Sequence, residues 1–137
     1  MSRARARTFT DPDQLAAEMA AAAAKVGPAT ARAVRHEAVV LQALIQAAAS
    51  GRPGPNAVTG QYRASWLVQV RPRRHGATAT VGTFAPQARR LELGFHGTDA
   101  LGRTYAQQPF PHVAPALALL QPRFAERIAT AAMGAFT

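Results

Sequence analysis

Cysteine is absent from the 137 residues, which excludes disulfides and thiolate metal sites. No run approaches the roughly 20 apolar residues of a membrane span. The arginines near the start are not followed by a long apolar region, so we expect no signal peptide. Aromatic residues are few, and much of the apolar content is alanine. Because alanine buries little surface, we expect a thin core that is completed by contacts between subunits.

Sequence patterns for catalysis are also lacking. There is no glycine-rich phosphate loop ending in lysine and no His-Glu-x-x-His. The histidines lie far apart, which is more typical of scattered surface residues than of a metal site. Glu92 sits in an apolar stretch, where a carboxyl group could be a general acid or could stabilise a turn or a subunit contact. The structural role is favoured, because no second carboxylate is placed near it. We therefore predict no enzyme activity, catalytic residue, metal or cofactor.

Positive charge is in excess. Sixteen basic residues against seven acidic ones give a formal charge of +9, and all the basic residues except Lys25 are arginine. This excess favours phosphate-rich or acidic partners, although GC-rich coding and a solvated surface would also account for arginines. No known nucleic-acid-binding signature is present. The basic residues that we expect to face DNA or an acidic neighbouring protein are Arg71, Arg73 and Arg74, followed by Arg3, Arg5 and Arg7.

The first half of the chain has helical periodicity. Residues 1–9 are interpreted as a flexible basic arm, and residues 10–137 as a single domain. A capping side chain, a proline and acidic residues predict a helix start at Thr10-Asp11-Pro12-Asp13. Gly27-Pro28 is expected to break or bend this helix. A second helix is predicted over residues 29–49.

The second half favours strands and a final helix. After a loop over residues 50–60, we predict strands at residues 61–71, 77–84 and 89–95, and a short one at 104–107. A last helix begins near Val113, with Pro122 expected to kink it. This order predicts an α+β fold, in which an antiparallel sheet of three to four strands is packed by an N-terminal helix pair and a C-terminal helix.

Three segments carry a resemblance to a known family. Residues 57–66 resemble a Thr-Gly-x-Leu-Arg-x-Ser-Ile motif, residues 85–94 a Tyr-Ala-x-x-Val-Glu-Phe-Gly motif, and residues 108–117 a Pro-x-Pro-Phe-Leu-x-Pro-Ala motif. Together they resemble the gene-product-ten-like tail-completion and head–tail joining family of long-tailed bacteriophages, which includes the minor tail protein Z type. The matching scaffold residues are Thr59, Gly60, Arg63, Ser65, Ala88, Glu92, Gly94, Pro109, Phe110, Pro115 and Ala116.

The resemblance implies a structural protein of the phage neck. It would form a homo-oligomeric ring of six subunits at the head–tail junction, next to other neck and tail proteins and around the path of packaged DNA. It would be a virion protein that passes through the host cytoplasm during assembly. The alternatives are a tail terminator ring and a free basic DNA-binding protein. We expect an inter-subunit loop made by His96, Gly97, Asp99, Leu101, Gly102 and Arg103.

Overall fold

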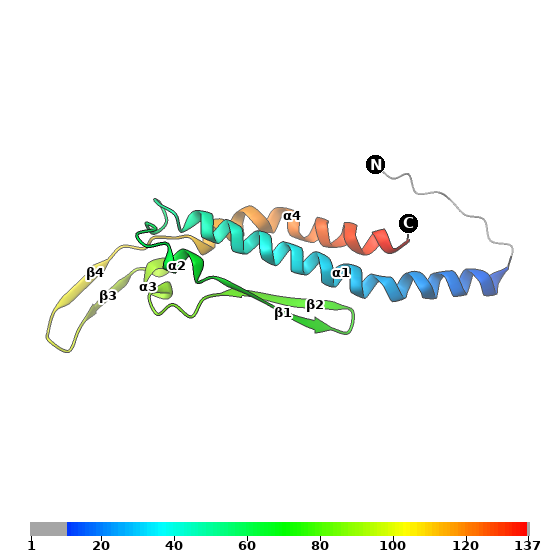
Figure 1. The fold of residues 1–137 in the computed structure, drawn as a ribbon, viewed down its shortest axis with the longest axis horizontal. Coiled ribbons are helices and arrows are strands. Elements are labelled where there is room, and N and C mark those ends of the chain that lie inside the picture. The colour runs from blue at the N-terminus through cyan, green and yellow to red at the C-terminus, as the bar shows by residue number, and fades with distance from the viewer. Residues whose placement is uncertain (1–10, 137) are drawn as a thin grey trace. The chain divides into compact units, whose positions relative to one another are not determined.

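The computed structural model describes residues 11–136 and combines helices with antiparallel strands (Figure 1). The predicted basic arm, with Arg3, Arg5 and Arg7, lies outside the described residues. The elements are α1 (Pro12–Ala48), α2 (Gln61–Ala64), β1 (Leu67–Arg73), β2 (Gly76–Gly82), α3 (Ala88–Leu93), β3 (Phe95–Thr98), β4 (Thr104–Gln107), α4 (Val113–Met133) and a 3₁₀ turn η1 (Gly134–Phe136).

The α+β class and the long helices near both ends are confirmed, but the single sheet is not. Among the described residues the strands form two separate sheets of two strands each, β1 with β2 and β3 with β4. Each pair is a hairpin of neighbouring strands, so its register depends on local turns. In the second hairpin, Phe95 lies opposite Gln107 and Thr98 opposite Thr104.

α1 is one continuous helix, so the predicted break at Gly27-Pro28 is wrong. A proline inside a helix removes one hydrogen bond, a loss that tertiary contacts can outweigh. At Gly27, an added Cβ would lie 3.7 Å from the Arg74 carbonyl oxygen, in the turn between β1 and β2. Gly76, the first residue of β2, faces Thr30 of the helix. The contact at Gly27 is of ordinary van der Waals length, whereas Gly76 brings the hairpin close to Thr30, so the continuous helix packs against the hairpin where the break was predicted.

Two predicted strands begin as helices instead. The segment 61–71 opens with α2 before β1, and the segment 89–95 is mostly α3. Gly94 ends α3 with a φ of +76°, and a Cβ there would lie 2.8 Å from the Gln107 carbonyl oxygen. The alternation of Leu91, Leu93 and Phe95 suggested a strand, but no neighbouring strand pairs with Leu91 or Leu93 in the described structure.

The described chain divides into two compact units by its contacts. The first combines α1 up to Glu37 with residues 70–79 and the chain from Arg123 onward. Here the buried Glu37 carboxylate accepts a hydrogen bond of 3.0 Å from the Arg127 guanidinium, which joins α1 to α4.

The second unit comprises residues 38–69 and 80–122 and contains a small hydrophobic core. Ile45, Trp66 and Ala116 are buried at its centre. The partly buried side chains around them are Leu41, Leu44, Tyr62, Val81 and Val113. This core therefore contains few large side chains, as the alanine content of the sequence predicted.

Candidate functional site

The start of α4 is held by the carboxylate of Glu92. Its Oε2 accepts hydrogen bonds from the backbone N–H groups of His112 and Val113, at 2.8 and 3.0 Å, and its Oε1 accepts one from Ala114 at 3.0 Å. The first N–H groups of a helix have no partner within the helix, and a negative charge there is stabilised by the helix dipole. Glu92 therefore caps a helix that begins about twenty residues further along the chain.

The ionised form of Glu92 is favoured by this arrangement. Partial burial raises the pKa of the carboxyl group, but the three backbone N–H donors and His112 outweigh it and hold the pKa below its ordinary value. A general acid at neutral pH needs a raised pKa instead. The geometry thus supports the structural interpretation of Glu92 over the catalytic one.

His112 lies beside this cap and is fully buried. Its Nδ1 is 2.8 Å from the Phe110 carbonyl oxygen, which can only accept, so Nδ1 carries the proton in the neutral ring. Nε2 then accepts a hydrogen bond of 2.6 Å from the Tyr62 hydroxyl. The rings of Tyr62, Trp66 and His112 meet edge to face, with centroids 5.6 to 6.2 Å apart. Burial, followed by the nearby Glu92 charge, raises the pKa of Tyr62 to about 12.

The segments that carry the family resemblance meet in this cluster. Tyr62 comes from residues 57–66, Glu92 from 85–94 and His112 from 108–117. Pro109 packs close to Gly94, and the buried Ala116 lies in the core. Pro115 falls in the first turn of α4, where a missing N–H costs little. These groups join distant segments and present no activated nucleophile, since a raised pKa keeps Tyr62 protonated.

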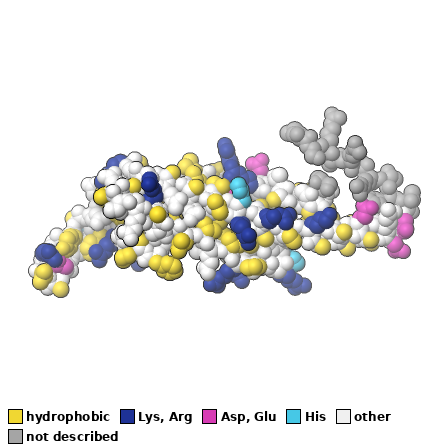
Figure 2. Space-filling view, in the orientation of Figure 1, with side chains coloured by type: hydrophobic (Ala, Val, Ile, Leu, Met, Phe, Trp, Pro, Cys, Tyr) yellow, Lys and Arg dark blue, Asp and Glu magenta, His cyan; other side chains and the backbone are white. Residues whose placement is uncertain are grey.

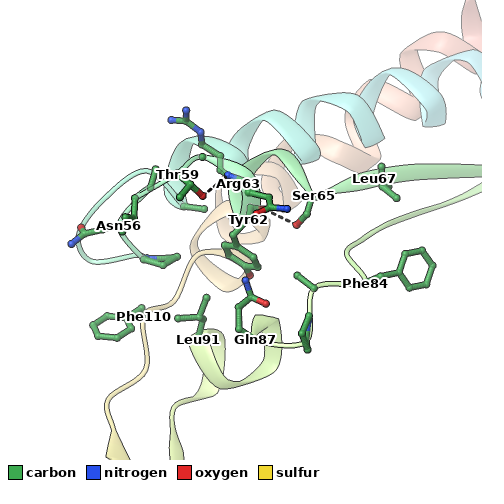
Figure 3. Close-up of a pocket in the computed structure, with 18 of the residues that line it drawn as sticks. Asn56, Thr59, Tyr62, Arg63, Ser65, Leu67, Phe84, Gln87, Leu91 and Phe110 are labelled. Atoms are coloured by element: carbon green, nitrogen blue, oxygen red, sulfur yellow. Dashed lines mark hydrogen bonds between the residues drawn. The ribbon is translucent and has the colours of Figure 1, made fainter.

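An open apolar pocket of about 870 Å³ adjoins the cluster (Figure 3). We call it the α2 pocket, because α2 and its flanking loops form one wall. The scaffold residues Thr59, Gly60, Arg63 and Ser65 line it. Gly60 has a φ of +76°, which favours glycine where the loop turns into α2. The Ser65 hydroxyl lies 2.7 Å from the Thr83 hydroxyl and joins the two sides.

The opposite wall of the α2 pocket is formed by the segment before α3. Phe84 from this segment and Val58 from the first wall are 93% and 91% exposed. Phe110 also lines the pocket, and the Arg52 guanidinium lies over its ring at 4.1 Å. Exposed apolar side chains therefore line the α2 pocket on both walls.

The turn between β3 and β4 is tightly hydrogen bonded. The Asp99 carboxylate accepts bonds from the backbone N–H groups of Leu101 and Arg103, from the Arg103 guanidinium at 2.6 Å and from the Tyr105 hydroxyl at 3.0 Å. The backbone N–H of Arg103, then its guanidinium and the Tyr105 hydroxyl, hold the pKa of Asp99 below its ordinary value. Gly102 has a φ of +77°.

The predicted loop over residues 96–103 is therefore part strand and part fixed turn. His96 and Gly97 belong to β3, and the Phe95 ring lies where a side chain at Gly97 would be. The turn presents Leu101, which is 77% exposed. An ordered turn loses less conformational freedom on contact with a partner than a mobile loop would.

The predicted basic residues Arg71, Arg73 and Arg74 are exposed at the β1–β2 hairpin, over which Figure 2 shows basic side chains. The Nε of Arg73 donates a hydrogen bond of 3.1 Å to the Thr78 hydroxyl. None of the three arginines has an acidic partner among the described residues. The hairpin therefore carries three positive charges in solvent. The scaffold residue Ala88 is the first residue of α3, which follows the segment that contains Phe84.

Three important residues were missed by sequence reasoning. His112 was taken for a scattered surface histidine, and Tyr62 for a strand residue. No local pattern reveals their hydrogen bond, because they are fifty positions apart. Glu37 did carry a signal, since it neighbours Ala38 on the apolar side of α1 and is 2% exposed. A carboxylate in such a position requires a partner, which Arg127 provides.

The sequence matches no protein-family model, and no curated protein or solved structure is significantly similar to it. Among residues 11–136, no helix is both long and apolar enough to cross a membrane. In the same part of the chain, no group of three or more histidine, aspartate or glutamate side chains is arranged to hold a metal ion.

Proposed function

We propose that this protein is a structural subunit of the neck of a long-tailed bacteriophage, where it forms a ring at the head–tail junction and completes the tail. It acts through assembly, without catalysis or a cofactor. Its partners are further copies of itself, in a ring of six, and the neighbouring neck and tail proteins. It resides in the virion and, during assembly, in the host cytoplasm.

One observation carries the proposal: the resembling segments meet in a single hydrogen-bonded cluster. Glu92 caps α4, and Tyr62 binds His112 at the same helix start. A motif set that maintains a scaffold is expected of an assembly protein, whereas an enzyme would direct such residues toward a substrate. The lowered pKa of Glu92 and the raised pKa of Tyr62 agree with the scaffold role.

Exposed apolar side chains support association with other subunits. Large exposed apolar groups in contiguous patches mark interaction sites. The large apolar side chains that are exposed in the described chain are Leu15, Met19, Val39, Val58, Leu67, Phe84, Leu93, Leu101, Tyr105, Leu117, Leu119, Phe124, Met133 and Phe136. Leu101, on its fixed turn, is proposed to contact a neighbouring subunit or ring.

Deletion of the gene from the phage genome that encodes it tests the proposal. We expect filled heads and separate tails of normal length, because the joint between them is missing. A tail terminator would instead leave tails of uncontrolled length. A free basic DNA-binding protein, supported only by the charge of +9, would leave joined particles. Electron microscopy of the lysate separates the three outcomes, and complementation from a plasmid is the control.

A further inference from the structure

We propose that the α2 pocket binds an extended peptide segment of another protein, one that carries apolar and acidic side chains. The inference goes beyond the proposed ring, because it concerns recognition of a different chain and is tested on the isolated protein. Failure of either proposal would therefore leave the other intact. The described residues that line the pocket all belong to the second compact unit, so the site lies within one unit.

Exposed apolar side chains stand on both walls of the α2 pocket. Val58 on one wall and Phe84 on the other are almost fully exposed, and Leu67 in the lining is 54% exposed. Contact of apolar surface with water is unfavourable, and large exposed groups gathered at one place mark interaction sites. A volume of about 870 Å³ is large enough for several side chains. The occupant is therefore expected to offer apolar side chains to both walls.

Amide side chains also lie on both walls. Asn56 lies on the α2 wall and Gln87 on the opposite one (Figure 3), and Gln61 of α2 belongs to the lining too. All three are exposed, and their side-chain amides make no hydrogen bond to another described residue. Each amide offers a donor and an acceptor, which are the groups that pair with a peptide backbone. Because a helix satisfies its backbone groups internally, these amides favour an extended segment.

Positive charge borders the same pocket. Arg52 and Arg63 belong to its lining, and none of the described lining residues is acidic. The Arg52 guanidinium donates to the Gly54 carbonyl oxygen at 3.0 Å, and that of Arg63 donates to the Ser50 hydroxyl at 3.1 Å. Both acceptors are neutral, so these contacts leave the two positive charges uncompensated. A carboxylate next to the apolar side chains of the occupant would be complementary to them.

The charge of this chain favours a different protein as the source of the segment. Copies of a chain with a net charge of +9 repel one another at long range, whereas an acidic partner is attracted. In the second compact unit, the carboxylates of Glu92 and Asp99 are already held by the start of α4 and by Arg103. A segment of another protein can bring carboxylates that are free to pair with the arginines of the pocket.

Fluorescence anisotropy with labelled synthetic peptides and the purified full-length protein tests this contact. The probes are extended peptides of roughly nine residues, or about 30 Å, with two apolar residues at varied spacing and aspartate, serine or lysine beside them. We expect some aspartate peptides to bind about fivefold more tightly than their serine counterparts, the factor of one favourable surface ion pair. The lysine counterparts should bind more weakly still.

Variants of the pocket separate its apolar contribution from its charge. Phe84→Ser should weaken binding of the best aspartate peptide at least about tenfold, because a large apolar contact is lost. Since Phe84 is 93% exposed, the variant is expected to fold normally. Leu119→Ser is the matched control and should leave the affinity unchanged, because Leu119 is 68% exposed on α4 and is not part of the lining.

A second pair of variants tests the positive charge. Arg52→Gln should weaken binding of the aspartate peptide about fivefold and leave the serine peptide unaffected. Arg90→Gln is its control, because the Arg90 guanidinium lies over the Phe95 ring at 4.1 Å, as that of Arg52 lies over Phe110, but outside the pocket. Should Arg52→Gln fold poorly by circular dichroism, Arg63→Gln makes the same charge change.

Several results would overturn the proposal. They are absence of binding by every peptide, equal binding of aspartate and lysine peptides, and equal effects of Phe84→Ser and Leu119→Ser. Sedimentation of the protein without peptide gives a further check. If the protein self-associates and Phe84→Ser abolishes this, the occupant is a second copy of the chain. If laurate binds in a manner that depends on Phe84 and no peptide does, the pocket takes an amphiphile instead.

Discussion

At the scale of single residues, Glu92 determines how α4 begins. Three backbone N–H groups depend on its carboxylate, so Glu92→Ala leaves them without this acceptor. We expect the free energy of unfolding to fall by about 1 to 2 kcal/mol, as for the loss of a strong helix cap. Urea unfolding measures the change. Glu126→Ala, an exposed position on the same helix, is the control and should change stability by less than about 0.5 kcal/mol.

The Glu92 cap also predicts a pH dependence. Because the pKa of Glu92 is lower in the folded protein than in the unfolded chain, its stabilisation is complete above the ordinary pKa of 4.5 and is lost as the pH falls through the folded value. The difference in unfolding free energy between the natural protein and Glu92→Gln should therefore be largest at pH 7 and shrink below pH 4.5. A difference that stays constant from pH 7 to pH 3 would contradict the capping role, as measured by urea unfolding at each pH.

At the scale of elements, the conformation of the β3–β4 turn depends on the side chain of Asp99. Asp99→Ala removes the acceptor for the Leu101 and Arg103 amides. We expect hydrogen exchange at these two amides to accelerate roughly tenfold, the effect of about one lost hydrogen bond. The amides of Phe95 and Gln107, at the other end of the hairpin, provide the internal control. Unchanged exchange at Leu101 would show that the backbone alone orders the turn.

The secondary structure of this chain was predictable in segments where the local sequence pattern and the tertiary contacts favour the same element. The helices near both ends, β2 and β4 match the periodicity and turn residues of their segments. The segment of α3 was predicted as a strand, because its leucines alternate. In the structure it is a short helix, and the carboxylate of Glu92 from this helix lies at the start of α4. In α1, Gly27-Pro28 lies inside a continuous helix that packs against the β1–β2 hairpin, and the local tendency of Gly-Pro to end a helix does not include this long-range contact.

At the scale of the whole molecule, we propose that the distribution of arginines governs contact with packaged DNA. Replacement of Arg71, Arg73 and Arg74 by Glu reverses the charge of the β1–β2 hairpin, which a ring would repeat in every subunit. We expect particles that still join heads to tails but retain or eject DNA poorly, because phosphate attraction becomes repulsion within the Debye length of about 8 Å. DNA release from purified particles measures this effect.

A matched variant separates this role from total charge. Arg32→Glu, Arg35→Glu and Arg123→Glu change the net charge equally at other exposed positions, and should leave DNA retention near normal. If the hairpin variant instead prevents joining of heads and tails while the subunit stays folded, the three arginines dock on an acidic surface of the next ring, and the DNA-facing prediction is wrong.

The sequence by itself determined the α+β class, the thin alanine-rich core and the positive charge, because these follow from composition and from patterns within a few residues. Only the tertiary structure decided that α1 is continuous, that the strands form two separate hairpins, and that Tyr62, Glu92 and His112 meet. Each of these depends on contacts between residues far apart in the chain, whose free energy local propensity does not contain. The α2 pocket was also decided by the tertiary structure alone, because its two walls come from segments that approach one another only in the folded chain.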